Sequence, residues 1–313
     1  MSGWLPGAPC TPGACIETER VGTSAVPRAV LRVTAVVALL LVGIALAAIG
    51  RRLPTRLVRA WCLAIVRAAG VRVRINGAAA PTGGLLLVAN HISWLDIPLL
   101  AAVRPARMLA KSEIRRWPVV GPLVALGGVL FIQRDRLRAL PNTVARIADA
   151  LRCGQAVAVF PEGSTWCGQA QGSFHRAVFQ AALDAGVPVQ PVRLRYRVEG
   201  GTASTTPAFV GEDSLLASVW RVASARGLVA EVDVRDVLPP GGHDDRRSLA
   251  RAAQPGKAPQ PDWTHVVLVA RTRTKTPGAT PPIRPRAVGL AYRDIIRRTR
   301  TTAPRTTNSP ADA

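Results

Sequence analysis

From residue 84 onward the chain alternates short apolar runs with amphipathic stretches, and this alternation restricts the possible folds more than any other feature. The run GLLLVA at 84–89 is typical of a strand buried on both faces. Repeated strand–helix units of this kind predict an α/β fold, in which a largely parallel sheet is flanked by helices. The expected strands span residues 84–89, 107–110, 128–133, 156–160, 188–198 and 229–237. The expected helices span residues 94–103, 112–126, 139–151 and 176–185.

The composition agrees with a folded core and predicts an anionic partner. Hydrophobic residues make up 48% of the 313 residues, which excludes a wholly disordered chain. Lys and Arg number 41 against 19 Asp and Glu, and the net charge of +22 favours nucleic acid or an anionic membrane surface. The arginines are scattered, without the aromatic interleaving of a single-strand binder. We therefore expect membrane lipids and no nucleic acid as partners, with a basic nucleic-acid-binding protein as the remote alternative.

Residues 33–50 carry no charge and form the longest apolar run of the chain. A bilayer core is crossed by about 17–25 such residues, so the run predicts an anchor that spans or re-enters the cell membrane. A buried core helix and a cleaved signal peptide are the two alternatives. More arginines follow the run closely than precede it, which favours a catalytic domain on the cytoplasmic side.

The remaining segments complete a division into four regions. Residues 55–69 form a basic amphipathic helix, which lies either in the membrane interface or on the surface of the folded domain. We expect a disordered N-terminus, a membrane-anchoring helical region, a catalytic domain, and a basic, mostly disordered tail. These regions span residues 1–27, 28–69, 70–245 and 246–313, respectively.

The five cysteines are too few for a disulfide-stapled scaffold. Cys10 and Cys15 offer two ligands without a second pair or a nearby histidine, so we expect no metal site. Cys167 has no activating base beside it in the sequence, which argues against a nucleophilic role.

The first group of reactive residues follows the strand at 84–89. His91 stands just past the strand, where a neutral imidazole can serve as a general base, and Asp96 follows five residues later. Catalytic groups of parallel sheets gather at the carboxyl ends of strands. The turn into the next helix could bring Asp96 back toward the His91 ring, and we expect its carboxylate to orient the imidazole. The alternative is a helix-capping box over residues 93–96, in which Asp96 serves only the backbone.

Two more strand ends carry polar residues. After the strand at 156–160, Glu162 is followed by Gly163, Ser164 and Thr165, whose backbone amides and hydroxyls suit an anion or an oxyanion. Arg134 follows the strand at 128–133, and its guanidinium could bind a phosphate in a bidentate manner. The alternatives are an ordinary strand-to-loop turn and a solvated arginine.

Taken together, four ordered motifs resemble the glycerolipid acyltransferases of the lysophosphatidic acid acyltransferase type. The motifs are Asn90-His91 with Asp96 (an HX4D motif), Phe131-Ile132-Gln133-Arg134, Phe160-Pro161-Glu162-Gly163-Ser164 and Val187-Pro188-Val189-Gln190-Pro191-Val192. The resemblance covers roughly residues 55–240 and implies an α/β acyltransferase domain behind a membrane-docking helical region. It implies transfer of a fatty acyl group from acyl-CoA or acyl carrier protein (acyl-ACP) to a lysolipid hydroxyl in phospholipid biosynthesis. The implied catalytic pair is His91 and Asp96, with no cofactor beyond the acyl co-substrate.

The acceptor that the resemblance implies depends on one departure from the common motif. Many relatives with a phosphate-bearing acceptor have an arginine where this chain has Thr165. Arg134 remains, and Arg176 is a second candidate for the missing phosphate contact. The resemblance favours 1-acylglycerol-3-phosphate as acceptor, giving phosphatidic acid. The alternative is a lyso-ornithine lipid, because the branch that acylates this aminolipid also lacks the arginine.

Overall fold

The structure is a computed structural model that describes residues 7–17, 22–48, 53–112, 128–132, 137–254 and 256. The expected helix at 112–126 falls almost entirely outside these residues, as does Arg134. Most of the expected tail also lies outside them.

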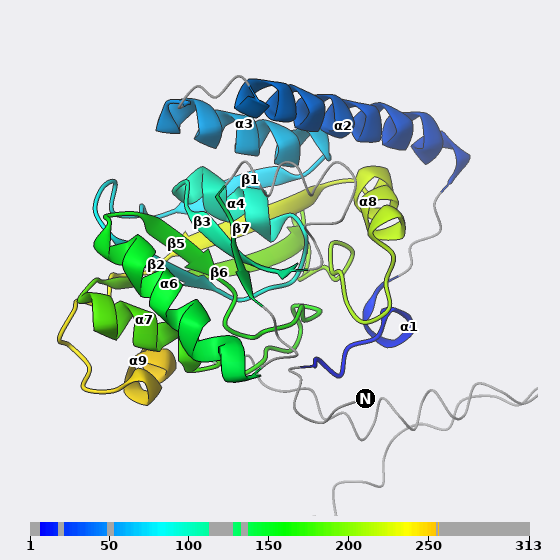
Figure 1. The fold of residues 1–313 in the computed structure, drawn as a ribbon. Coiled ribbons are helices and arrows are strands. Elements are labelled where there is room, and N and C mark those ends of the chain that lie inside the picture. The colour runs from blue at the N-terminus through cyan, green and yellow to red at the C-terminus, as the bar shows by residue number, and fades with distance from the viewer. Residues whose placement is uncertain are drawn as a thin grey trace, which may run out of the picture. The chain divides into compact units, whose positions relative to one another are not determined.

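The described domain is built around a seven-stranded mixed sheet with the order β1-β7-β6-β2-β5-β3-β4 (Figure 1). All neighbouring strands in this sheet pair in parallel except β6 and β7, which are antiparallel. The strands are β1 (Arg72–Asn76), β2 (Leu85–Ala89), β3 (Arg107–Lys111), β4 (Leu130–Ile132), β5 (Ala156–Val159), β6 (Val189–Val198) and β7 (Leu228–Val234). The prediction of a largely parallel α/β sheet is confirmed.

The central strands are buried because helices cover both faces of the sheet. Every residue of β2 and β5 is buried, as their continuous apolar runs predict. On one side lie α2 (Val26–Ala48), α3 (Thr55–Ala68) and α4 (Asp96–Val103), and on the other lie α6 (Leu140–Arg152), α7 (Ala177–Ala185) and α9 (Arg246–Ala253) (Figure 1). The second side encloses a hydrophobic cluster that includes Leu86, Ile147 and Phe179.

The elements that the sequence did not predict include β1 and α8 (Leu215–Ser224). In β1 only alternate side chains are half-buried, and arginines occupy two of the exposed positions. A short edge strand with this composition gives a weak apolar signal. Helix α8 begins at Ser214, whose hydroxyl accepts a hydrogen bond from the backbone N–H of Ala217.

The folded domain continues past residue 246, where the tail was expected to begin, because α9 packs against it. Asp245 caps α9 by accepting the backbone N–H groups of Arg247 and Ser248 at 2.5 and 2.8 Å. Leu249 and Ala253 are buried in the cluster that contains Phe179. The apolar face of α9 is only two turns long and lies among arginines, so the sequence pattern did not predict a helix here.

The expected disordered N-terminus is also corrected. Residues 7–17, which we call the N-terminal strap, contain the single-turn helix α1 (Pro12–Cys15). Cys10 is 1% exposed and Cys15 is 8% exposed. Burial of these two thiols orders a segment whose Gly and Pro content suggested disorder.

Residues 33–48 of the apolar run belong to α2, which begins at Val26. Residues 23–46 are long and apolar enough to cross a membrane. Their most apolar window of 18 residues has a mean hydropathy of 2.6, and only 17% of that window is buried. Leu31 and Leu41 are exposed, so the alternative of a buried core helix is wrong.

The arginine-bearing start of α2 contacts the end of α8. Arg32 donates hydrogen bonds to the carbonyls of Ala223 and Ala225 at 2.9 and 2.7 Å. Cations stabilise the carbonyl end of a helix in this way.

Helix α3 packs between α2 and α4 and uses its apolar face within the domain. Trp61 donates its indole N–H to the carbonyl of Leu39 in α2 at 2.9 Å. Arg59 donates to the carbonyl of Ala102 in α4 at 2.8 Å. The described contacts therefore favour the surface-helix alternative for residues 55–69.

Candidate active site

The candidate active site lies where β2 and β5, two adjacent parallel strands, end at the same edge of the sheet. Asn90 and His91 follow β2, and Glu162 follows β5. The side chain of Asn90 continues the pairing of β2 with β6, because its amide donates to the carbonyl of Leu194 at 3.0 Å and accepts its N–H at 2.8 Å. This clamp fixes the backbone immediately before His91.

The structure brings His91 and Asp96 together as predicted. Nδ1 of His91 lies 2.8 Å from Oδ2 of Asp96, whose side chain is fully buried. The same Oδ2 accepts the backbone N–H groups of Ile92 and Ser93 at 2.6 and 2.8 Å. Asp96 therefore does serve the backbone, as the capping alternative proposed, and it also holds the imidazole.

A second group holds Asp96 from the neighbouring strand. Tyr196 in β6 donates its hydroxyl to Oδ1 of Asp96 at 2.6 Å. Complete burial, followed by the charge of Asp96, raises the pKa of Tyr196 well above its usual value, so the phenol stays a donor. The sequence did not single out Tyr196, although its alternation with Leu194 places both on one face of β6.

Stacking against an aromatic ring also holds the imidazole of His91 in place. The rings of His91 and Phe160 stack with centroids 3.9 Å apart and planes within 10°. Because the Asp96 carboxylate accepts from Nδ1, the neutral ring carries its proton there and presents an unprotonated Nε2. The His91 side chain is 18% exposed, which leaves it within reach of a substrate.

Glu162 joins the loop that follows β2 to the loop that follows β5. Oε2 accepts the backbone N–H of His91 at 2.7 Å, and Oε1 accepts that of Gly172 at 3.0 Å. Burial, aided by the nearby charge of Asp96, raises the pKa of Glu162 to about 8, against the opposing effect of these two hydrogen bonds. Glu162 therefore positions His91 through the backbone.

Residues 163–172, which we call the cysteine loop, pass directly beside His91. Trp166 donates its backbone N–H to the carbonyl of His91 at 2.8 Å. Gly163 has a φ of 73° and donates its N–H to the carbonyl of Phe160 at 3.1 Å. The buried hydroxyl of Ser164 has no hydrogen-bond partner among the described residues. Likewise, the backbone amides of Ser164 and Thr165 have no acceptor within that part of the chain.

The structure describes only one of the two arginines predicted to bind substrate. Arg176 is exposed where α7 begins and does not line the cavity at this edge of the sheet. Arg134 lies outside the described residues.

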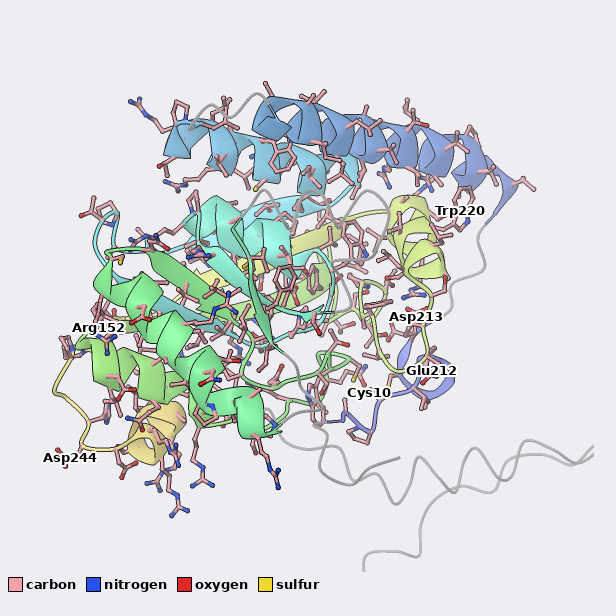
Figure 2. The ribbon with its side chains drawn as sticks, in the orientation of Figure 1. Cys10, Arg152, Glu212, Asp213, Trp220 and Asp244 are labelled. Carbon is pink, nitrogen blue, oxygen red and sulfur yellow. The ribbon has the colours of Figure 1, made fainter. Side chains whose placement is uncertain are left out.

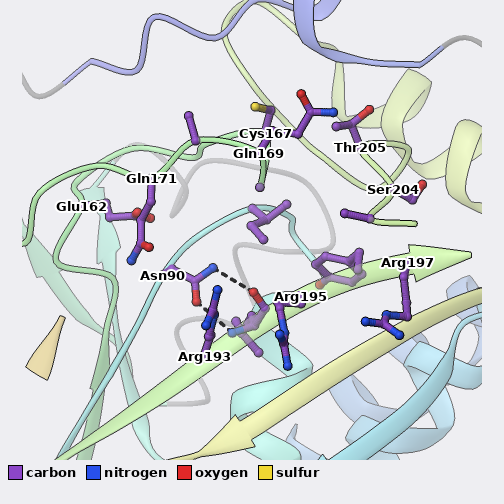
Figure 3. Close-up of a pocket in the computed structure, with 16 residues that line it drawn as sticks. Asn90, Glu162, Cys167, Gln169, Gln171, Arg193, Arg195, Arg197, Ser204 and Thr205 are labelled. Carbon is purple, nitrogen blue, oxygen red and sulfur yellow. Dashed lines mark hydrogen bonds between the residues drawn. The ribbon is translucent and has the colours of Figure 1, made fainter. Parts of the chain in front are cut away.

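A cavity of about 190 Å³ adjoins the site (Figure 3). Asn90 and Glu162 line it, together with Arg193, Arg195 and Arg197 of β6. Arg195 and Arg197 form ion pairs with acidic residues of β7, whereas Arg193 has no ion pair among the described residues. Burial and the neighbouring charges of Arg195 and Arg235 lower the pKa of Arg193. His91 is not among the lining residues, so this cavity lies beside the reacting centre.

Comparisons with known proteins identify the family of this chain. A family model described as "Acyltransferase" matches residues 70–195. The chain is 38% identical over 239 residues to a lyso-ornithine lipid O-acyltransferase of Pseudomonas aeruginosa, covering 72% of this chain and 91% of that protein. It is 37% identical over 166 residues to a 1-acyl-sn-glycerol-3-phosphate acyltransferase of Neisseria gonorrhoeae, covering 53% of this chain and 65% of that protein.

Among solved structures, the chain is similar to the 1-acyl-sn-glycerophosphate acyltransferase of Thermotoga maritima, with 19% sequence identity and a TM-score of 0.47. That match covers 72% of this chain and 81% of the other. The near-complete alignment with the Pseudomonas protein confirms the resemblance that the four motifs indicated. This chain belongs to the family of acyltransferases that includes the 1-acyl-sn-glycerol-3-phosphate and lyso-ornithine lipid acyltransferases.

Proposed function

We propose that this acyltransferase moves a fatty acyl group from acyl-CoA or acyl-ACP to the free hydroxyl of a lysolipid at the cytoplasmic face of the cell membrane. The observation that carries the proposal is the contact of 2.8 Å between Nδ1 of His91 and Asp96, which leaves Nε2 as the proton acceptor. His91 and Asp96 are the proposed catalytic residues.

The proposed reaction is a direct transfer. Nε2 of His91 removes the proton of the acceptor hydroxyl as its oxygen attacks the thioester carbonyl. Asp96 stabilises the imidazolium that forms and keeps the ring oriented. When the tetrahedral intermediate collapses, the carbon–sulfur bond breaks and the imidazolium returns its proton to the leaving thiolate. An ester and a free thiol are the products, and the step uses no metal or further cofactor.

The negative charge on the carbonyl oxygen requires hydrogen-bond donors during the reaction. Gly163 is excluded as the amide donor because its N–H is bound to Phe160. The amides of Ser164 and Thr165, together with the Ser164 hydroxyl, are the better candidates. A well-placed donor of this kind contributes about 10²–10³-fold to the rate.

Two acceptors fit the chain. The Pseudomonas relative supports a lyso-ornithine lipid, since that match extends over nearly the whole relative, and Thr165 replaces the arginine of the common motif. The Neisseria relative supports 1-acylglycerol-3-phosphate as the second candidate, together with Arg134 in the FIQR motif. We place the lyso-ornithine lipid first because an ornithine headgroup carries no phosphate and does not require the missing arginine.

The membrane attachment is proposed to use the exposed apolar side of α2. Val30, Leu31, Leu41 and Val42 are all exposed there, although the helix also packs on α3 and α8. An apolar helix flanked by arginines suits an anionic bilayer surface.

The function is tested by supplying one labelled acyl-CoA, and separately the matching acyl-ACP, to the purified full-length chain in lipid vesicles. The acceptors are a lyso-ornithine lipid, 1-acylglycerol-3-phosphate and lysophosphatidylcholine. We expect labelled diacyl product from the first and a smaller amount from the second. Thr165→Arg should shift the ratio of the two products toward phosphatidic acid by about 10-fold or more, as a charge-assisted contact is gained. Failure to acylate any lysolipid with either donor would contradict the proposed function.

A further inference from the structure

Three cysteines from two segments that are distant in the sequence meet in the folded domain. The Sγ atoms of Cys10, Cys15 and Cys167 all lie within 4.8 Å of one another. All three residues are buried, and Cys10 and Cys167 are each only 1% exposed. The sequence predicted no metal site because Cys10 and Cys15 offer two ligands. The fold supplies the third from the cysteine loop.

The N-terminal strap is shaped so that both of its thiols face the cysteine loop. The turn of α1 is closed by hydrogen bonds from Cys15 N–H to the carbonyl of Thr11 and from Ile16 N–H to that of Pro12, at 3.0 and 3.1 Å. Beyond the turn, Glu17 donates its backbone N–H to the hydroxyl of Thr205 at 3.0 Å. Figure 2 shows Cys10 near the turn that carries Glu212 and Asp213.

The third thiol stands on a loop that is fixed to the active site. Trp166, next to Cys167 in sequence, donates its N–H to the carbonyl of His91, and the loop ends at Gly172, which is bound to Glu162. Any Cβ at position 168 would stand 3.2 Å from the Ile92 side chain, so the backbone after Cys167 lies close to the strand-end loop. The three thiols therefore connect the strap to the segment that holds His91.

The number and spacing of the sulfur atoms fit a metal ion better than a disulfide. A disulfide would join two of the three thiols and leave the third buried beside it. A tetrahedral ion with Zn–S bonds of about 2.3 Å sets its sulfurs about 3.8 Å apart, so the observed sulfurs need to approach by only about 1 Å. Three thiolates around a divalent cation carry one net negative charge, which suits a chain of net charge +22. Cys167 also lines the cavity whose other side carries Arg193, Arg195 and Arg197 (Figure 3).

We propose that Cys10, Cys15 and Cys167 bind one Zn²⁺ ion, which ties the N-terminal strap to the cysteine loop beside His91. Each thiol releases its proton to solvent as it becomes a ligand. The three thiols occupy three of the four positions of a tetrahedral ion, and the fourth is open to a further ligand such as water. The ion acts as a cross-link between two segments, and the acyl-transfer step does not pass through it.

The first test measures metal binding by the full-length chain in detergent, after reduction and removal of metals. Co²⁺ is the probe, because thiolate ligands give it an intense charge-transfer absorption that Zn²⁺ abolishes by displacement. We expect one Co²⁺ per chain, displaced by one Zn²⁺. Cys10→Ser, Cys15→Ser and Cys167→Ser should each weaken binding by roughly 100-fold or more, since even loss of an outer-shell partner costs about 10–100-fold.

Two other cysteines provide matched controls. Cys153 is exposed and Cys62 is buried in α3, both outside the cluster. Cys153→Ser and Cys62→Ala should leave the Co²⁺ absorption unchanged. Absence of the charge-transfer band in the reduced wild type, or its persistence in all three ligand variants, would overturn the proposal.

A second measurement does not require the ligand variants to fold. Zn²⁺ should protect Cys10, Cys15 and Cys167 of the wild type from alkylation, while Cys153 reacts, as mass spectrometry of the peptides can show. Zn²⁺ should also raise the Tm, because it binds only the folded arrangement. Full alkylation of the three thiols in the presence of Zn²⁺ as well as in its absence would contradict the site. A disulfide within the cluster, together with no Zn²⁺ binding after its reduction, would identify a redox pair instead.

Discussion

The hydroxyl of Tyr196 in β6 lies 2.6 Å from Oδ1 of Asp96, while the other oxygen of the same carboxylate lies 2.8 Å from the imidazole of His91. The pairing of β6 beside β2 brings Tyr196 to this carboxylate across a long stretch of sequence. Asp96 is thus fixed from its own loop and from the adjacent strand. Orientation of His91 therefore depends on the sheet as well as on the HX4D motif.

Tyr196→Phe should lower both stability and turnover. The substitution leaves Oδ1 of Asp96 without its buried donor, which costs about 1.5–3 kcal/mol in the free energy of unfolding. Because Asp96 then holds the imidazole less firmly, kcat should fall while KM stays near its wild-type value. Urea unfolding and steady-state kinetics measure the two effects.

Thr143→Val is the control at a buried residue outside the site. The Thr143 hydroxyl donates to the carbonyl of Ala139, the residue before α6. The substitution should cost stability without lowering kcat. An equal loss of kcat in both variants would show that Tyr196 acts on activity only through stability.

Glu162 should make stability depend on pH. Burial raises the pKa of its carboxyl from 4.5 to about 8, so between these values the folded state retains a proton that the unfolded state releases. The contribution of Glu162 to stability is therefore complete below pH 4.5 and is lost as pH rises toward 8. In Glu162→Gln this titration is absent. The difference in unfolding free energy between wild type and variant should shrink by up to about 1.4 kcal/mol per pH unit over this window. Parallel curves from pH 5 to pH 8 would refute the raised pKa.

Membrane attachment should depend on the exposed residues of α2. Leu31 and Leu41 are 71% and 52% exposed, so replacing both with Asp should leave the fold intact. The wild type should stay in the membrane pellet through a high-salt wash, because salt screens the arginines but not the apolar contact. The double variant should appear in the supernatant, whereas Val237→Asp, at an exposed apolar site after β7, should remain in the pellet. Release of the wild type by salt alone would contradict insertion of α2.

The contact between α2 and α3 can be tested by a double-mutant cycle at Gly43 and Trp61. The effect of Gly43→Ala on the free energy of unfolding should change sign when Trp61 is replaced. A Cβ at Gly43 would clash with the Trp61 ring, which the hydrogen bond to the carbonyl of Leu39 holds in place. Gly43→Ala should therefore destabilise the wild type by about 1–3 kcal/mol, even though alanine gains about 1 kcal/mol over glycine inside a helix. In a Trp61→Leu background the same change should be neutral or stabilising. A stabilising effect of Gly43→Ala in the wild type would mean that α3 does not pack here.

The sequence predicts most of the sheet and the central pair of the site, for identifiable reasons. Continuous apolar runs reveal β2 and β5 because both are buried on two faces, and the strand-end rule then places His91 next to Glu162. The edge strand β1 and the short helix α9 were missed, since each buries only a few side chains. Tyr196 and the cluster of Cys10, Cys15 and Cys167 depend on long-range packing, which no local pattern encodes.

The central claim is that His91, oriented by Asp96, is the base that activates the acceptor hydroxyl. It is tested most directly by the initial rate of labelled acyl transfer to the preferred lysolipid in wild type, His91→Ala and Asp96→Asn, with His243→Ala as the matched control. His243 lies in the loop before α9, away from the site. The account predicts a loss of about 10²–10⁴-fold or more in kcat for His91→Ala, a severe loss for Asp96→Asn, and no change for His243→Ala. All four chains should bind membranes equally. Near wild-type turnover by folded His91→Ala would contradict the mechanism, and full activity of Asp96→Asn would reduce Asp96 to a backbone cap.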